Sequence, residues 1–591
     1  MLKGDPLARV LYIDLSRRKY WVEDRSDLFE NYIGGTGVAT KLLLEECPKN
    51  ADPLGFENPI IFAVGPLTAV FPTASKTVAT FKSPLTNEFG ESHAGGRSAV
   101  AIRMAGYGAI VIKGASDIPI YLAIHGDKVY FKDARALWGI DDAITVGRII
   151  REVEPNAGYR TIMRIGGAGE KLVRYACVTT ETYRHFGRLG LGAVFGSKKL
   201  KAIVISGKRS IKVKVPSLYK ELYNEIFEKC VKTPLMKKYH DIGTSVNVLP
   251  LNKIGALPTK NLKSARFEYA ERISGETLAK EFLGRRIACA HCPVGCIHLA
   301  ALRIPYEDEP YFYKTEMISY DYEPIYALGS MLGISDPEGL LRLLERVERY
   351  GIDAISTGVV LAWTTEAYEK GLISHKETMN LTPKWGDYKT YMNLIDMIVE
   401  QPNEFYESIA RGVKYASEKY GGREFALQYG GNEMAGYHTG PAFHVGLLVG
   451  ARHSHLDSAG YSYDQKALKQ NIKLTPEKVA ERLLSEEQWR QILTSLVICL
   501  FARGIYTSET VVKTLHVMGF EFTEDDLYKI GREILLMKYK FKIREGVNVK
   551  DIRFPQRVLE TPTPHGTLSE DFLKKVAKLY LEMLGITNLT R

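Results

Sequence analysis

The chain has 591 residues, of which 45% are hydrophobic and 25% charged. A chain of this length accommodates about three or four ordinary domains or one large body. Its proportions of hydrophobic and charged residues exclude disordered and fibrous proteins. The formal charge of +10 is spread along the chain, so an acidic protein partner is weakly favoured and no nucleic acid is expected.

The N-terminus and the cysteines predict a cellular location. Residues Met1 to Pro6 lack the apolar core of a signal peptide, and no apolar run approaches the ~18 residues that span a bilayer. Seven cysteines, three of them bunched, suit a reducing compartment with a metal site better than a disulfide framework. We therefore expect a cytoplasmic protein with no membrane partner.

The first third of the chain is predicted to be rich in β-structure. Residues 9–15 and 20–23 form a predicted hairpin, and further strands are predicted at 59–64, 109–113, 173–178 and 202–206. A helix is predicted to follow Gly34-Gly35-Thr36-Gly37 and to run through Leu44. We place the first domain boundary near residue 210.

Glycine turns recur between these strands, interleaved with arginine and lysine. They include Gly95-Gly96, Gly166 to Gly169, and Gly187 to Gly192. Backbone N–H groups in such turns bind anions, but none of the turns has the spacing of a P-loop or a dinucleotide site. A tight strand-to-helix turn explains each turn equally well by itself. Together they favour an anionic, non-nucleotide cofactor.

From Pro216 onward the pattern becomes helical. Ser274 is a predicted N-cap of a helix that runs into a cysteine-rich loop, and Ser335-Asp336-Pro337 begins a helix that Gly351 ends. Another helix is predicted from about Thr357, and the last third is predicted helical from 476 to 541. We predict an α+β fold, with a β-rich N-terminal cofactor-binding domain (1–210) followed by two mostly helical domains (211–420 and 421–591).

The cysteine-rich loop places Cys289, Cys292 and Cys296 in the spacing Cys-x2-Cys-x3-Cys. An iron–sulfur cluster takes several thiolates from one tight loop, whereas a radical-generating enzyme would reverse this spacing. The loop also fits a structural zinc site completed by His291 or His298, or a disulfide with a spare thiol. Cys499 lies in an apolar segment that ends a predicted helix, where a structural core cysteine is equally common.

These residues together resemble the tungsten-containing aldehyde:ferredoxin oxidoreductase family over nearly the whole chain. The resemblance rests on the early Gly34–Gly37 turn, Ser83-Pro84-Leu85-Thr86, Ala94-Gly95-Gly96, the segment from Arg184 to Lys198, the cysteine loop and Cys499. It implies a [4Fe–4S] cluster held by Cys289, Cys292, Cys296 and Cys499. It also implies a tungsten atom held by two molybdopterins, whose phosphates a Mg²⁺ ion bridges.

The resemblance further assigns cofactor contacts position by position. Lys76 lies where the family usually has an arginine that contacts pterin and cluster, and His93 lies where an asparagine usually helps bind magnesium. The family's second pterin motif reads Glu348 to Asp353 in its first copy, while its second copy is altered at Thr494 and Val497. The remaining implied contacts are Gly95, Arg184, His185, Gly187, Arg188, Asp457 and Ser458.

The resemblance also implies the catalytic residues. Glu323 corresponds to the family's active-site glutamate, which activates water or takes a proton. His455 fits the active-site histidine best, with His453 as the rival, and Tyr437 is a second hydrogen-bond donor to the substrate carbonyl. Apart from the resemblance, each of these is an ordinary surface or core residue.

The resemblance predicts oxidation of aldehydes to carboxylic acids, with electrons passing through the cluster to ferredoxin or a small polycluster iron–sulfur subunit. The alternatives are a low-potential reductase of acids or aromatic thioesters on the same scaffold, and a non-catalytic iron–sulfur electron-transfer subunit. Some relatives dimerise around an iron atom, and Arg342 occupies the position expected for its glutamate ligand. We therefore expect a monomer or a heterodimer.

Overall fold

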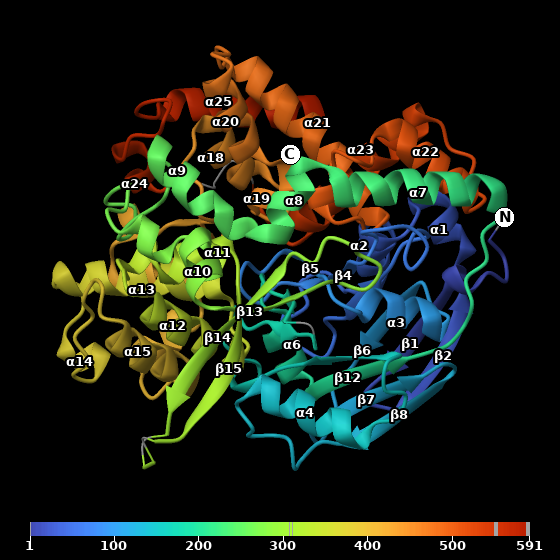
Figure 1. Ribbon diagram of the computed structural model, residues 1–591, viewed down its shortest axis with the longest axis horizontal. Helices are drawn as coiled ribbons and strands as arrows, with labels where there is room; N and C mark the ends of the chain where they lie inside the picture. The colour runs from blue at the N-terminus through green and yellow to red at the C-terminus, as the bar shows by residue number, and fades with distance from the viewer. Residues whose placement is uncertain (1, 182, 307, 310, 549–552, 587–591) are drawn as a thin grey trace.

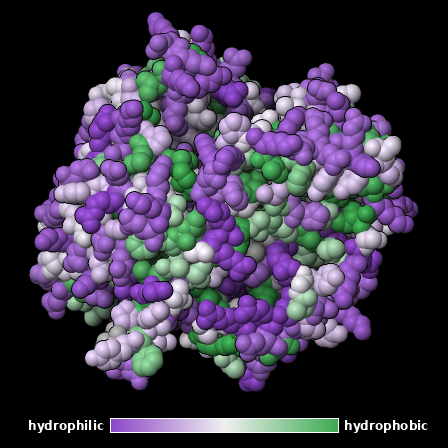
Figure 2. Space-filling model, in the orientation of Figure 1, coloured by the Kyte–Doolittle hydropathy of each residue, from purple (hydrophilic) through white to green (hydrophobic). Residues whose placement is uncertain are grey.

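The computed structural model describes residues 2–181, 183–306, 308–309, 311–548 and 553–586. Two mixed sheets from the N-terminal third lie at one side of the molecule, and helices from the rest of the chain surround them (Figure 1). This arrangement confirms the predicted α+β class. Hydrophilic residues cover most of the face seen in Figure 2, while hydrophobic residues show mainly toward its middle.

The first sheet has six strands in the order β2-β1-β6-β3-β4-β5. β1 and β6 pair in parallel, and the other neighbours are antiparallel. The strands are β1 (Arg9–Asp14), β2 (Lys19–Asp24), β3 (Ile60–Ala63), β4 (Thr77–Lys82), β5 (Phe89–Ala94) and β6 (Ala109–Lys113).

The second sheet also has six strands, in the order β11-β10-β9-β12-β7-β8. β7 and β12 pair in parallel. The strands are β7 (Ile120–His125), β8 (Lys128–Asp133), β9 (Arg160–Arg164), β10 (Val178–Thr179), β11 (His185–Phe186) and β12 (Leu200–Ser206). The helices among the strands are α1 (Ser26–Tyr32), α2 (Gly35–Glu46), α3 (Ser98–Ala105), α4 (Ala143–Val153), α5 (Gly167–Glu170) and α6 (Leu191–Ser197).

Both faces of the first sheet are buried, which explains why its central strands are apolar throughout. In β3, Ile60 and Phe62 face the core shared with the second sheet. Ile61 and Ala63 face the opposite core, which includes helix residues from the C-terminal third. Alternate side chains of a strand point to opposite faces, so β3 serves two cores at once.

The middle of the chain is mainly helical but carries a small antiparallel sheet of β13 (Leu283–Ile287), β14 (Ile297–Pro305) and β15 (Tyr313–Tyr320). Its helices are α7 (Pro216–Lys232), α8 (Pro234–Asp241), α9 (Val248–Ile254), α10 (Gly275–Glu281), α11 (Tyr322–Leu328), α12 (Pro337–Tyr350), α13 (Ala354–Glu369), α14 (His375–Thr378), α15 (Tyr388–Glu400), α16 (Glu404–Ile409) and α17 (Val413–Tyr420).

The last part contains one short hairpin, β16 (Gln428–Tyr429) and β17 (Asn432–Glu433), and otherwise helices. These are α18 (Pro441–Val449), α19 (His455–Ser458), α20 (Gly460–Lys469), α21 (Pro476–Ser495), α22 (Ser508–Val517), α23 (Glu524–Arg544), α24 (Gln556–Glu560) and α25 (Glu570–Leu584), with the short 3-10 segment η6 (Leu500–Ala502). Among the described residues, no helix is long and apolar enough to cross a membrane.

Local sequence signals set several helix ends as predicted. Asp336 accepts hydrogen bonds from the N–H groups of Glu338 and Gly339 at the start of α12, and Gly351 ends that helix at φ 66°. A side-chain acceptor at the N-cap and a left-handed glycine after the last turn satisfy the free backbone groups of a helix. Ser274 caps α10 in the same way.

Two element predictions were wrong. Of the predicted segment 173–178 only Val178 lies in a strand, because the chain turns there: Leu172 has φ 59°, and the N–H of Ala176 donates to Val173. The α10 helix does not run into the cysteine loop, because it ends at Glu281 and β13 follows. The loop is instead the connection between β13 and β14.

Candidate active site

Residues 73–76, which directly precede β4, connect the cysteine loop to Cys499 through backbone hydrogen bonds. Thr73 donates its N–H to the carbonyl of His291 (2.9 Å) and accepts the N–H of Cys499 at its own carbonyl (3.0 Å). Lys76 donates its N–H to Val497 (3.1 Å). These backbone bonds hold a cysteine two hundred residues away in sequence beside the loop, because segment 73–76 contacts both.

All seven cysteines are free, so the disulfide interpretation of the loop was wrong. Burial first, and then the thiols of Cys499 and Cys289, raise the pKa of Cys296 to about 12. The same influences raise the pKa of Cys292. Cys47, Cys177 and Cys230 are buried; Cys177 lines the cavity described below, and burial and then Cys499 raise the pKa of Cys230. The four predicted cluster ligands therefore lie close enough to affect one another, although no described group of three or more His, Cys, Asp or Glu side chains converges as a site for a single ion.

His298 is engaged away from these thiols. Its Nδ1 lies 3.1 Å from the carbonyl oxygen of Cys296, and its Nε2 lies 3.0 Å from that of His240. A ring whose two nitrogens both face backbone carbonyls has no nitrogen left as a ligand. The zinc interpretation that used His298 as fourth ligand is not supported by this geometry.

Lys76 and Gly95 lie beside the same thiols. Burial opposes the charge of Lys76, but Cys499 and Cys289 outweigh it, and the pKa of Lys76 is raised. A Cβ atom placed on Gly95 would lie 2.7 Å from Sγ of Cys289 and 3.1 Å from Nζ of Lys76. Only a glycine fits here, because a side chain would occupy the space next to the thiols.

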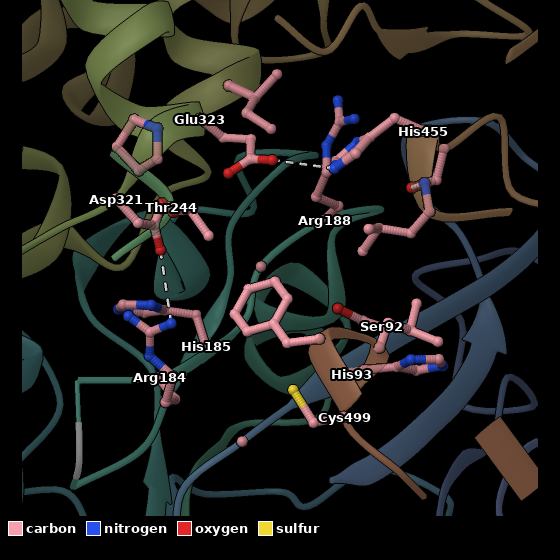
Figure 3. Close-up of a pocket in the computed structure, with 18 of the residues that line it drawn as sticks. Ser92, His93, Arg184, His185, Arg188, Thr244, Asp321, Glu323, His455 and Cys499 are labelled. Atoms are coloured by element: carbon pink, nitrogen blue, oxygen red, sulfur yellow. Dashed lines mark hydrogen bonds and ion pairs between the residues drawn. The ribbon is translucent and has the colours of Figure 1, made fainter. Parts of the chain in front are cut away.

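A cavity of about 610 Å³ opens beside Cys499 and is walled by residues from all three parts of the chain. Figure 3 shows side chains from several elements around this cavity. Ser92 and His93 come from β5, and Arg184, His185 and Arg188 come from the region of the second sheet. Asp321 and Glu323 come from the start of α11, and His455 comes from α19. Twelve predicted site residues outside the cysteines line this cavity with Cys499: Lys76, His93, Gly95, Arg184, His185, Gly187, Arg188, Glu323, Glu348, Asp353, Tyr437 and His455.

Basic side chains from the N-terminal third are paired with carboxylates from the middle of the chain along the cavity wall. Arg184 contacts Asp321 (3.5 Å), and Nε2 of His185 lies 3.3 Å from Glu348. Nε of Arg188 lies 3.3 Å from Oδ2 of Asp353. Burial raises the pKa of Asp321, and Arg184 opposes that rise. Long side chains paired in this way are fixed in orientation.

Several buried polar atoms in this wall have no hydrogen-bond partner among the described residues. They are Nη1 of Arg188, Oε1 of Glu348 and Oδ1 of Asn432. An unsatisfied buried donor or acceptor costs about 1–3 kcal/mol, so a ligand that carries both donors and acceptors would relieve all three. A pterin with its phosphate group has this combination. Gly187 leaves room next to them, since a Cβ there would meet nothing closer than 3.9 Å.

His93 is fixed by a buried ionic group beneath the cavity. Its Nε2 lies 2.8 Å from Oε1 of Glu91, whose other oxygen contacts Lys538 (2.7 Å). Arg452 lies 3.4 Å from the same Glu91 oxygen as His93. Burial works against the charge of Glu91, but Lys538 and Arg452 overcome it and hold the pKa of Glu91 well below its usual range. His93 therefore presents a firmly held ring to the cavity.

Glu323, Tyr437 and His455 meet at the other side of the cavity. The hydroxyl of Tyr437 donates to Oε1 of Glu323 (2.8 Å), and Nε2 of His455 lies 3.1 Å from the same oxygen. Figure 3 shows the Glu323 and His455 side chains facing each other across the pocket. Burial raises the carboxyl pKa, but His455 and Tyr437 together outweigh it, so the pKa of Glu323 is lowered.

Tyr437 remains a donor over the physiological pH range. Burial, and then the charge of Glu323, raise the pKa of Tyr437 well above its usual value. Nδ1 of His455 is buried without a hydrogen-bond partner among the described residues. This site therefore offers a carboxylate, a phenol and one free imidazole nitrogen.

A capped turn determines which histidine reaches the cavity. Ser454 and Asp457 form a capping box at the start of α19, and Nε of Arg452 donates to Asp457 (2.6 Å). His453 points away, with Nδ1 on the carbonyl oxygen of Leu447 and Nε2 on Glu88 (both 2.9 Å). Asp457 and Ser458 lie behind the cavity wall, with Asp457 holding Arg452 and the turn in place. Their role as direct pterin contacts stays a prediction.

Two family models match the chain along most of its length. One, described as aldehyde ferredoxin oxidoreductase, N-terminal domain, matches residues 10–207, and the other, described as domains 2 and 3 of the same enzyme, matches 221–589. The chain belongs to the aldehyde ferredoxin oxidoreductase family. Membership in this family makes the chain an oxidoreductase enzyme and implies a tungsten–pterin cofactor.

Curated relatives span almost the whole chain. The tungsten-containing aldehyde ferredoxin oxidoreductases of Thermococcus kodakarensis and Pyrococcus furiosus are 31% and 32% identical, each over 98% of this chain and 96% of the relative. A Pyrococcus furiosus aliphatic sulfonate oxidoreductase, WOR-like subunit, is 27% identical over 98% of this chain and 94% of its own length.

A solved structure shows the same fold. The active-site complex BamBC of benzoyl coenzyme A reductase, bound to 1,5-dienoyl-CoA, superposes with a TM-score of 0.82 at 22% identity. The match covers 98% of this chain and 94% of that one. At this identity the likeness establishes the aldehyde ferredoxin oxidoreductase fold and nothing about the substrate.

Several residues of this family member's cavity were not singled out from the sequence. Asn432, Tyr239, Tyr461, Lys238 and Arg503 all line it. Asn432 follows the Gly430-Gly431 turn, and such a turn gives only a weak signal that the next side chain has a special position. The other four lie in helical segments whose sequences resemble ordinary half-exposed faces, so no local pattern distinguishes them.

Proposed function

We propose that the chain oxidises aldehydes to carboxylic acids and passes the two electrons through a [4Fe–4S] cluster to ferredoxin or an iron–sulfur subunit. The observation that carries this proposal is the meeting of Glu323, Tyr437 and His455 on one cavity that Cys499 also lines. The names of the curated relatives support it, since they are aldehyde ferredoxin oxidoreductases.

The residues present fit the two redox groups. Cys289, Cys292, Cys296 and Cys499 would hold the cluster, because four partly buried thiols so close together need cations to be stable as thiolates. The unpartnered Arg188 and Glu348 atoms, with His185 and Asp353, would hold the pterin part. Lys76, Gly95, Arg184 and Gly187, which line the same cavity, would complete that cradle, and His93 would help to hold a Mg²⁺ ion.

When bound, the tungsten–pterin group supplies the two-electron chemistry, and the cluster divides the electrons into single transfers. The protein residues manage the protons. Oxidation of an aldehyde, with water as the source of the added oxygen, yields a carboxylic acid, two protons and two electrons for the redox groups, so a base and a hydrogen-bond donor are both needed. Glu323 and His455 provide them at adjacent positions.

Glu323 is charged at neutral pH because His455 and Tyr437 lower its pKa. Both neighbours contact Oε1, so Oε2 is the oxygen available to take a proton from the attacking water. Nε2 of His455 faces Glu323, so Nδ1, which has no partner among the described residues, is the imidazole nitrogen that would face the aldehyde oxygen. The Tyr437 hydroxyl holds Glu323 in place throughout.

We further propose that the chain works as a monomer or with an iron–sulfur subunit, and not as an iron-bridged homodimer. Nη2 of Arg342 on α12 lies 2.9 Å from Glu338. A guanidinium has no lone pair for a metal ion, so this position cannot supply a ligand. Sizing of native protein with quantified iron tests this, and a homodimer with one additional iron per pair of chains would contradict it.

Purified protein tests the catalytic proposal directly. We expect one tungsten, two pterins and four irons per chain as predicted by the family, together with aldehyde-dependent reduction of a viologen under anaerobic conditions. Iron without tungsten or pterin would contradict the proposed chemistry. The low-potential reductase alternative predicts instead that acids or aromatic thioesters are consumed when a strong reductant is supplied.

A further inference from the structure

Two cations line the same cavity as the catalytic residues and are not used by the proposed chemistry. Lys238 is on α8, and Arg503 directly follows η6, only four residues after Cys499. Both side chains are partly buried. They lie with the apolar residues Leu235, Leu500 and Phe501, which also line the cavity.

Neither cation has an acidic partner among the residues that the structure describes. Nζ of Lys238 lies over the ring of its neighbour Tyr239, 5.1 Å from the centroid, and Nη1 of Arg503 donates to the carbonyl of Leu500 (2.8 Å). Both residues line the same cavity, and burial and then the charge of Arg503 lower the pKa of Lys238. Two like charges in a partly buried place repel, and an anion between them would relieve that repulsion.

Aromatic rings connect this pair with the catalytic residues. Tyr239 stacks on Phe501 at 4.5 Å, and Tyr437, the Glu323 partner, stacks on Tyr461 at 4.3 Å. The four rings of these two pairs all line the cavity. Tyr461 is 6.0 Å from His455 between ring centroids. The path from catalytic residues to cations is therefore walled by flat, mainly apolar surfaces.

We propose that Lys238 and Arg503 form an anion-binding subsite, and that the preferred substrate is an aldehyde with an aromatic or apolar body and an anionic group at its far end. This inference rests on the proposed aldehyde oxidation. The aldehyde group reaches Glu323 and His455, the body lies against Tyr461, Tyr239 and Phe501, and the anion contacts Lys238 and Arg503. The anion is a carboxylate, sulfonate or phosphate.

A set of matched aldehydes tests the subsite in the holoenzyme. 4-Formylbenzoate, 4-formylbenzenesulfonate and 4-formylphenyl phosphate carry the anion, and methyl 4-formylbenzoate is a neutral molecule of similar size. We expect at least one anionic aldehyde to have a kcat/KM about tenfold or more above that of the neutral ester, since hydrogen bonds to charged groups are worth about that factor. Equal use of neutral and anionic aldehydes would overturn the subsite.

Arg503→Gln and Lys238→Gln should each raise KM for the preferred anion about tenfold and leave the neutral ester unchanged within about twofold. Lys237→Gln is the matched control, because Lys237 is next in sequence, 71% exposed and paired with Asp241. Equal increases in KM for neutral and anionic aldehydes would refute the proposal. A change confined to KM for the electron acceptor would show a different role and refute it as well.

Calorimetric titration with terephthalate, which has two carboxylates and no aldehyde, separates this inference from the proposed reaction. Binding to the native enzyme that Arg503→Gln weakens would support the subsite even if no aldehyde were oxidised. Absence of terephthalate binding in an enzyme that oxidises neutral aldehydes would sink the subsite and leave the proposed function standing.

Discussion

Substitution of Glu323 by glutamine is the most informative single change in the active site. The glutamine amide would keep an oxygen where Tyr437 donates at 2.8 Å and where His455 lies at 3.1 Å, so the local shape is retained. The variant would lose the negative charge and the proton acceptor. The change therefore tests the carboxylate itself and not the packing around it.

The expected loss follows from what the carboxylate does. A positioned acid or base contributes about 10²–10⁴ in rate, and we expect kcat of Glu323→Gln to fall within that range. Nε2 of His455 contacts the same carboxylate oxygen, so a change at Glu323 also disturbs the contribution of His455. Because the two residues act as one unit, Glu323→Gln combined with His455→Asn should be little slower than either change alone.

The pH dependence of the native enzyme provides a second check. The pKa of Glu323 is lowered from its ordinary value of 4.5, so its basic form is fully present above that value and is lost only as pH falls below it. We therefore expect no acidic limb from Glu323 in kcat/KM between about pH 6 and 8. A limb in that interval that Glu323→Gln abolishes would contradict the assigned charge state.

The assay is anaerobic viologen reduction by aldehyde, with tungsten and iron quantified in each preparation. Glu404→Gln is the matched control, because Glu404 is a 76% exposed carboxylate on α16. The control should keep native turnover, and Glu323→Gln should keep native metal content. Full metal content together with undiminished turnover in Glu323→Gln would refute the role proposed for this carboxylate.

The remaining predictions concern the cluster and the cavity wall. Cys499→Ala should lower iron content or convert the cluster to a three-iron form by electron paramagnetic resonance, and an unchanged four-iron signal would exclude Cys499 as a ligand. His455→Asn should lose about 10²–10⁴ in turnover. His453→Asn should change turnover far less, because the ring of His453 faces Glu88. A larger loss in His453→Asn than in His455→Asn would show that His453 is the active-site histidine. Gly95→Ala should lower iron and pterin content together, since its Cβ would lie 2.7 Å from Sγ of Cys289, and native content would show that the space is not needed.

Features set by local sequence were predicted well. The Asp336 cap and the Gly351 ending of α12 use backbone groups within a few residues, and the apolar run at Ile60 indicates a strand buried on both faces. The segment 173–178 contains residues that favour a strand. A strand also needs a neighbouring strand to pair with, and the turn at Leu172 directs most of this segment away from such pairing. β13 was missed because its exposed Arg285 and Arg286 give it no apolar alternation.

The site was predictable only through the family resemblance, and even then in part. The two histidines at 453 and 455 differ by two positions, and only the Ser454–Asp457 turn determines which one faces Glu323. Lys238 and Arg503 come from separate helical segments that long-range folding brings together beside the cavity. The positions of Lys238 and Arg503 in the sequence do not indicate that both line one cavity, because this arrangement depends on tertiary contacts alone.

The central claim is that this chain oxidises an aldehyde with water and delivers two electrons per product. The most direct measurement is anaerobic turnover of metal-quantified protein, with the carboxylic acid and the reduced one-electron viologen both counted. The account predicts one carboxylic acid formed for every two viologens reduced, and loss of both in Glu323→Gln. Full tungsten and iron content with no carboxylic acid from any aldehyde, while an acid or aromatic thioester is reduced, would contradict it.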